Sequence, residues 1–189
     1  MSRLCILWFK ELSSTMNLIE VLASQTEDAY GWVHKLVDSI PQEHWNTIPE
    51  VVETSVSWQV GHLVLSYYFH TIMTTVGHQM DILQKIPIKA YSELYHTASP
   101  ESASGKAEPE ELLQHLNTME QRSLEVIRSL SAEDLDSKLD PASYPHPVAK
   151  TKYEALDWNI KHTMWHCGQL GILKRVVHER YDFGLKRTN

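Results

Sequence analysis

The chain has 189 residues, of which 42% are apolar and 22% are charged. This length suits one domain with a substantial core, and the composition is that of a globular protein, not a disordered one. The net charge is −7, and Lys/Arg pairs occur only at 174–175 and 186–187 near the C-terminus, which argues against a nucleic-acid partner.

Cys5 and Cys167 are the two cysteines of the chain. One is close to a terminus and the other falls within an expected helix, so they do not form the pattern of a secreted disulfide framework. A reducing cytoplasm is therefore the expected location.

The N-terminus begins with a short apolar run that Lys10 and Glu11 interrupt. The run is too short to cross a membrane, and no signal-peptide cleavage pattern follows it. Because Met16 is an alternative start, residues 1–16 are expected to be an extension outside the functional domain. The domain itself is expected over 17–180, with a tail at 181–189.

From Asn17 to Ile40 the apolar residues recur at spacings near three and four, which predicts a first amphipathic helix. Pro41 closes this helix, and residues 42–53 form a connection. A second helix is expected to begin with an N-cap at Ser55 or Ser57 and to reach Gly77 or Met80. Its sequence is apolar around much of the circumference, which suits a buried helix.

Residues 81–107 lose the helical periodicity and contain two prolines. We expect a long loop here, with one short helical turn around Ala90–Tyr95. A connection of this length can carry the chain the whole way along a bundle. Pro109 then suits the first position of a third helix, which is expected to end near Leu130.

The Ser131–Asp134 stretch resembles a capping box that opens one or two turns, and prolines impose an irregular segment after it. Thr151 and Glu154 form a cleaner capping box, because each side chain can satisfy a backbone N–H of the other end. The fourth helix is predicted to start there and to continue to about His178. Four amphipathic helices without a strand pattern predict an all-α four-helix bundle.

The fourth helix carries His162 and His166, which lie on one face about 6 Å apart. Two imidazoles at this spacing can chelate one metal ion if a third ligand joins them. His62, on the buried second helix, is the natural third ligand. The plainer alternative is that these histidines are hydrogen-bonded or lie at the surface, as most such pairs do.

Three neutral imidazoles would leave at least one coordination position open, which is the layout of a catalytic site. They suit Zn, Ni, Fe or Co better than Mg or Ca, which prefer oxygen ligands. A metal of this kind can activate a water or bind a low-molecular-weight thiol as its thiolate. Both chemistries use the same ligands, so the trio does not choose between hydrolysis and thiol transfer.

Weaker candidates surround this trio. Gln169, one turn beyond His166, could hydrogen-bond a ligand or a coordinated water, although packing explains a glutamine there as well. Trp58, Trp158 and Trp165 could wall a pocket, but aromatic residues at helical spacing are usually part of the core.

Asp157 and Glu154 could steady a ligand imidazole, and a solvated first helical turn explains them equally well. Cys167 is expected to be a small core residue, because it lies about 100° around the helix from the neighbouring histidine. His70 is expected to lie in a belt of tyrosines or at the surface. No general base is assigned.

The motif Ser-x-Ser-Trp-x-x-Gly-His62-Leu and the motif His162-x-x-x-His166-x-x-Gln169 together resemble the DinB/YfiT superfamily of metal-dependent proteins. The resemblance covers roughly residues 17–180. It implies a four-helix bundle in up-down-down-up order, a three-histidine divalent-metal site open at one end, and a homodimer. Relatives include thiol-dependent S-transferases and isomerases, hydrolases, and proteins with no assigned activity.

The leading hypothesis is therefore a cytoplasmic metal-dependent enzyme that acts on a small molecule, as a hydrolase or as a thiol S-transferase. His62, His162 and His166 would bind the metal. One alternative is a non-catalytic metal-binding or stress-response protein in which the metal only joins two helices. A second alternative is a purely structural bundle in which the histidines hydrogen-bond to water.

Overall fold

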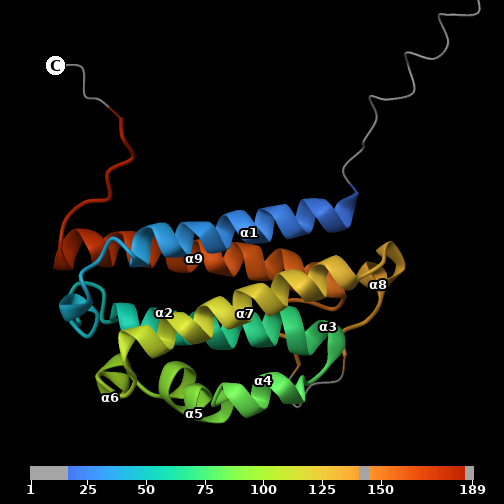
Figure 1. The fold of residues 1–189 in the computed structure, drawn as a ribbon, viewed down its shortest axis with the longest axis horizontal. Coiled ribbons are helices and arrows are strands. Elements are labelled where there is room, and N and C mark those ends of the chain that lie inside the picture. Colours follow the sequence, from blue (N-terminus) through green and yellow to red (C-terminus); the bar gives the residue numbers. More distant parts are fainter. Residues whose placement is uncertain (1–16, 141–144, 186–189) are drawn as a thin grey trace, which may run out of the picture.

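A computed structural model describes residues 17–140 and 145–185, and four long helices dominate it (Figure 1). The prediction of an extension at 1–16 lies outside the described residues. The long helices are α1 (Leu18–Val37), α2 (Val56–Tyr67), α7 (Pro109–Ser129) and α9 (Lys152–Val177). The helical path of α2 continues through the π-helical turn η2 (Tyr68–Met73) and the short α3 (Thr74–Val76). Within the described ranges the one extended pairing is an isolated bridge between Lys138 and Thr151.

The chain runs in one direction along α1, returns along α2, keeps that second direction along α7 and reverses again along α9 (Figure 1). The all-α, up-down-down-up bundle is therefore confirmed. Its helices pair so that α1 packs on α9 and α7, while α2 packs on α7 and α9. The two helices that carry the predicted ligands are consequently neighbours, although about a hundred residues separate them in sequence.

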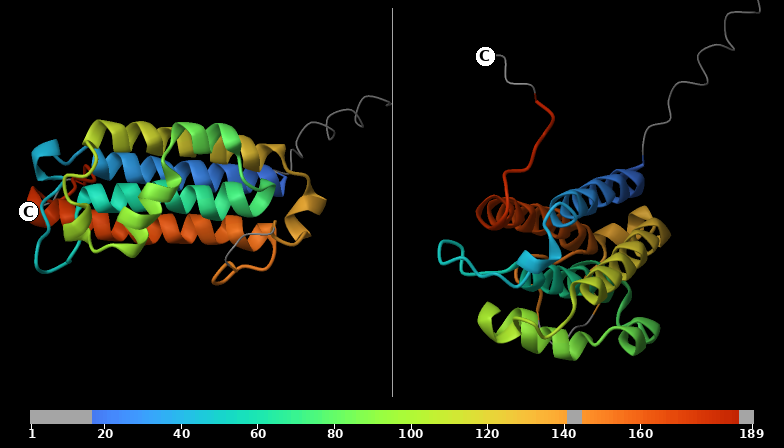
Figure 2. Two further views of the ribbon diagram at one scale, coloured as in Figure 1. Left: turned by 90° about the horizontal axis from the view of Figure 1, so that it is seen from below. Right: turned by 60° about the vertical axis from the view of Figure 1, so that its left-hand side comes forward.

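The parallel α2 and α7 are joined by a crossover that lies beside them, away from α1 and α9 (Figure 2). The expected helical turn around Ala90–Tyr95 is present, but the expectation of a loop over the rest of this segment was wrong. The crossover contains four short elements: α4 (Met80–Lys85), α5 (Ile88–Ser92), the π-helical turn η3 (Glu93–Thr97) and α6 (Pro100–Ala103). Each buries only one residue, which is Ile82, Tyr91, Tyr95 and Ala103 in turn. That is too little apolar periodicity for the sequence to reveal a helix.

The ends of the long helices follow local capping chemistry. Asn17 accepts backbone N–H groups at the start of α1, and Ser55, one of the two expected N-caps, does so at the start of α2. Thr151 and Glu154 form the expected capping box at α9. Gly77 ends the α2–α3 path with φ of +76°, a conformation that glycine adopts without strain.

Two shorter elements complete the described chain, namely a 3₁₀ turn, η1 (Gln42–His44), in the α1–α2 connection and the helix α8 (Ala132–Asp136), which the Ser131–Asp134 capping box opens. Residues 181–185 of the tail have no regular structure. None of the helices in the described parts of the chain has the length and apolar content needed to cross a bilayer.

Candidate metal centre

The structure brings His62, His162 and His166 together, although one comes from α2 and two come from α9. Each offers a ring nitrogen, and these three atoms all lie within 4.8 Å of one another. The Nε2 atoms of His162 and His166 are 3.2 Å apart. Two nitrogens bound to one zinc ion at tetrahedral angles would be about 3.3 Å apart, so this pair already has the separation of two ligands. The trio could therefore hold a metal ion.

Each of these imidazoles has an oxygen atom beside its other ring nitrogen. Nδ1 of His62 lies 2.8 Å from the backbone carbonyl oxygen of Tyr95, and Nδ1 of His162 lies 2.7 Å from the hydroxyl of Ser66. Nδ1 of His166 is hydrogen-bonded to the side-chain oxygen of Gln59. A carbonyl oxygen only accepts, so Nδ1 of His62 carries the proton and its Nε2 keeps a lone pair. The Tyr95 carbonyl and the Gln59 amide oxygen only accept, so they fix the tautomer whose Nε2 can coordinate, whereas the Ser66 hydroxyl, which can donate or accept, orients His162 without fixing its tautomer.

The surroundings of the trio favour neutral imidazoles. Burial lowers the pKa of all three rings, and the neighbouring histidines lower it further in His162 and His166. The pKa of His162 falls to about 4 and that of His166 to about 2. The neutral imidazole, whose lone pair is free, is the form that binds a metal.

Two of the three tryptophans that could wall a pocket lie beside the histidine trio. The ring of Trp58 stacks on His62 with centroids 5.0 Å apart, and the ring of Trp158 stacks on His162 at 5.9 Å. Both indoles are partly buried, and Trp158 also contacts the exposed Trp165 edge to face. These rings limit how a ligand imidazole can rotate and give the site apolar walls.

The other candidates lie away from the trio. Gln169 is exposed on α9, and among the described residues it has no hydrogen bond to a ligand histidine. Glu154 caps the first turn of α9, and Asp157 pairs with Lys161, so the reading of a solvated first turn fits both. Cys167 is buried, and burial raises the pKa of its thiol to about 12, as suits a core residue.

Sequence reasoning missed the side chains that support the ligands. Gln59 and Ser66 lie on the same face of the α2 path as His62, at spacings of three and four, and this pattern could have identified them. The expectation for His70 was wrong, because it is only 7% exposed and its ring centroid lies 5.2 Å from that of His162. Burial and the surrounding histidines lower its pKa to about 2. The carbonyl of Tyr95 had no sequence signal, since every residue has a backbone carbonyl.

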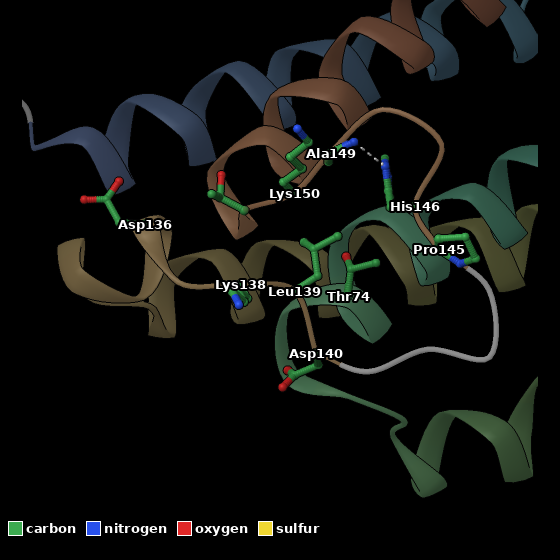
Figure 3. Close-up of a pocket in the computed structure, with 10 residues that line it drawn as sticks. Thr74, Asp136, Lys138, Leu139, Asp140, Pro145, His146, Ala149 and Lys150 are labelled. Carbon is green, nitrogen blue, oxygen red and sulfur yellow. Dashed lines mark hydrogen bonds between the residues drawn. The ribbon is translucent and has the colours of Figure 1, made fainter.

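A hollow of about 730 Å³ lies beside the segment that leads into α9. Figure 3 shows its lining, which comes from Thr74 of α3, from the end of α8 and the chain after it, and from the segment 145–151 that precedes α9. None of the three candidate ligands lines this hollow. His146 does, and its Nδ1 accepts the backbone N–H of Ala149 at 2.9 Å (Figure 3).

Comparisons with known proteins identify the fold and the family of this chain. No curated protein matches it. It is similar to a crystal structure described as a conserved protein of a locus from Enterococcus faecalis, with a TM-score of 0.65 and 18% sequence identity over 86% of this chain and 98% of that one. At this identity the likeness shows the fold alone. A family model described as the DinB superfamily matches residues 17–170, and this chain therefore belongs to the DinB superfamily.

Proposed function

We propose that this protein is a metal-dependent enzyme that binds a divalent transition metal through Nε2 of His62, His162 and His166. The observation that carries the proposal is the arrangement of the ring nitrogens. The Nε2 atoms of the α9 pair have the separation of two metal ligands, and all three Nδ1 atoms are next to an oxygen partner. A group of surface histidines would have no such set of oxygen partners.

The donor set narrows the choice of metal and of reaction. Three neutral nitrogens suit zinc, nickel, iron or cobalt and leave at least one coordination position for another molecule. When bound, such an ion lowers the pKa of a coordinated water or thiol toward neutrality, which makes either one a nucleophile. We therefore propose a hydrolase or a transferase that uses a low-molecular-weight thiol, acting on a small molecule in a reducing cytoplasm.

The protein's own residues hold and enclose this centre. Gln59, Ser66 and the carbonyl of Tyr95 keep the ligand rings in place, and Trp58 and Trp158 shield two of the rings from water. Formation of a homodimer, which the family resemblance implies, is part of the same proposal and is tested by light scattering.

Metal content tests the site. Protein purified without a histidine tag is expected to contain about one transition-metal ion per chain, as measured by inductively coupled plasma mass spectrometry. His62→Ala and His166→Ala should lose this ion. His115→Ala is the matched control, because the His115 imidazole has one hydrogen bond, to the hydroxyl of Tyr91, but belongs to α7 and is not a candidate ligand. Metal retained in both ligand variants would contradict the assigned site.

Measurements of turnover test whether the protein is an enzyme. Zinc, nickel and ferrous forms are compared for hydrolysis of simple esters and amides, and for consumption of a low-molecular-weight thiol with a chromogenic electrophile. We expect one class of reaction to depend on the metal and on His62. Loss of folding on chelation, with no turnover in any metal form, would contradict an enzyme and favour the non-catalytic metal-binding alternative.

A further inference from the structure

His70 is a histidine beside the candidate metal centre that is not one of its ligands. It lies in the π-helical turn η2, two helical turns beyond His62, and its ring stands nearly perpendicular to that of His162, at 74°. Short π-helical insertions in α-helices are frequent at functional sites. The hydrogen-bonding state of its two ring nitrogens indicates the role of this buried histidine.

A chain of hydrogen bonds determines which nitrogen of His70 carries the proton. The backbone N–H groups of Ala149 and Val148 donate to Nδ1 of His146, at 2.9 and 3.3 Å. A backbone N–H only donates, so Nδ1 of His146 is the acceptor and the proton of this neutral ring is on Nε2. That Nε2 lies 2.7 Å from Nδ1 of His70 and donates to it. Nδ1 of His70 is therefore an acceptor, and its own proton is on Nε2.

His146 is itself held in place. Its ring stacks on Phe69 with centroids 5.5 Å apart and planes at 1°. The backbone bond to Ala149 fixes the other edge of the ring (Figure 3). The orientation of His70 is therefore set by a second histidine, which is set in turn by the segment entering α9.

Among the described residues, no side chain or backbone group accepts a hydrogen bond from the Nε2–H of His70. Nor is this nitrogen among the described side-chain atoms that are fully buried without a partner. A neutral imidazole N–H next to a metal centre is suited to donate to an oxygen atom of a bound ligand.

We propose that His70, oriented by His146, is a binding residue that donates a hydrogen bond from Nε2 to a carboxylate or carbonyl oxygen of the molecule bound at the three-histidine centre. This inference rests on the proposed function. It adds a substrate feature, an oxygen acceptor close to the reacting group, and it gives the segment at 145–149 a role in setting the proton position.

The first test uses the cobalt form of the protein, because the visible absorption of Co²⁺ changes when its coordination sphere changes. Acetate serves as a small carboxylate probe. His70→Phe keeps a buried ring but removes the donor, and we expect it to bind one cobalt ion while its Kd for acetate rises about tenfold. His70→Gln, which restores an N–H donor, should stay within about threefold of the wild type. His115→Phe makes the same change at a histidine outside the site and should leave the Kd unaltered.

The second test needs no variant and uses histidine side-chain NMR of the wild-type zinc form. We expect His70 and His146 to carry their protons on Nε2, and acetate to shift the Nε2–H signal of His70. A purely structural His70 would have the same proton position but would not respond to acetate. This measurement decides the matter if His70→Phe does not fold.

The outcomes separate this inference from the proposed function. A wild-type protein that takes up no cobalt overturns both. Cobalt uptake with no saturable acetate response, or with an unchanged Kd in His70→Phe, overturns only the role of His70. A His70 proton found on Nδ1 also overturns it.

Discussion

Single residues beside the three candidate ligands would prepare these histidines to bind a metal. An imidazole can rotate and can exchange the proton between its two nitrogens, and either change would turn the lone pair away from the ion. In this protein Gln59 and Ser66 each occupy the Nδ1 side of one ligand histidine of α9. The rings are thereby left with Nε2 facing the shared centre, and less free energy is needed to order them when a metal binds.

Removing one of these partners should weaken metal binding without removing a ligand. We expect Gln59→Ala and Ser66→Ala to lower metal affinity by about 10- to 100-fold each, because a ligand ring loses the group that orients it. Competition with a chromophoric chelator measures the affinity, and circular dichroism checks that the bundle is intact. Gln169→Ala is the matched control, since Gln169 is exposed one turn beyond His166 and should not affect binding. Equal affinities in all variants would show that the partners do not orient the ligands.

At the scale of the elements, the packing of the crossover against α2 depends on one close contact. A Cβ added at Gly61 would lie 2.5 Å from the ring of Tyr95, which is fully buried in η3. The absence of a side chain at this position lets η3 approach α2. The same approach brings the Tyr95 carbonyl to His62. The glycine that precedes the ligand histidine thus has a packing role and, through it, a role at the site.

Gly61→Ala should disturb both packing and metal binding. The added methyl group would push against the Tyr95 ring, and we expect a loss of about 1–3 kcal/mol in the free energy of unfolding. Metal affinity should fall as well, because His62 loses its carbonyl partner. Gly31→Ala in α1 is the control, since a Cβ there meets no atom within 4 Å and should be neutral or stabilising. Urea unfolding and chelator competition measure the two effects, and a Gly61→Ala protein as stable as the wild type would contradict this account.

The sequence predicts the elements that repeat a pattern and misses those that depend on a single contact. The long helices carry many apolar residues at helical spacing, and local caps such as Ser55 and Thr151 mark their starts, so their bounds were within a few residues. The crossover helices are too short for such a pattern. At the site, the spacing of His162 and His166 is visible in the sequence. The pairing of His70 with His146 is not, because it depends on how the segment before α9 folds back on the bundle.

On the scale of the whole molecule, the candidate site lies between α2 and α9, while α1 and α7 are joined by a different polar contact. Nε2 of His34 on α1 lies 2.7 Å from a carboxylate oxygen of Glu120 on α7. The hydrogen bond that His34 donates to the Glu120 carboxylate raises the pKa of His34, whereas burial raises the pKa of Glu120. His34, between α1 and α7, therefore favours its charged form. The three histidines between α2 and α9 favour the neutral form.

This contact should make stability depend on pH. The folded pKa of His34 is above its unfolded value of 6.5, so its contribution is fully present below pH 6.5 and is lost as the pH rises through the folded pKa. We expect His34→Gln to lower the free energy of unfolding by about 1–2 kcal/mol at pH 6 and by clearly less at pH 8.5. Urea titrations of the metal-free protein at the two pH values measure this difference. The protonation of the other histidines occurs in both proteins and cancels. An effect of His34→Gln that is the same at both pH values would contradict the assignment.

The origin of the candidate ligands in α2 and α9 also matters during synthesis of the protein. A nascent chain that has left the ribosome only as far as α7 presents one of the three histidines and lacks the other two. The centre can be completed only after the last long helix has emerged. Metal loading is therefore expected only after α9 has emerged, and a truncated product that stops before α9 should be unable to capture the ion.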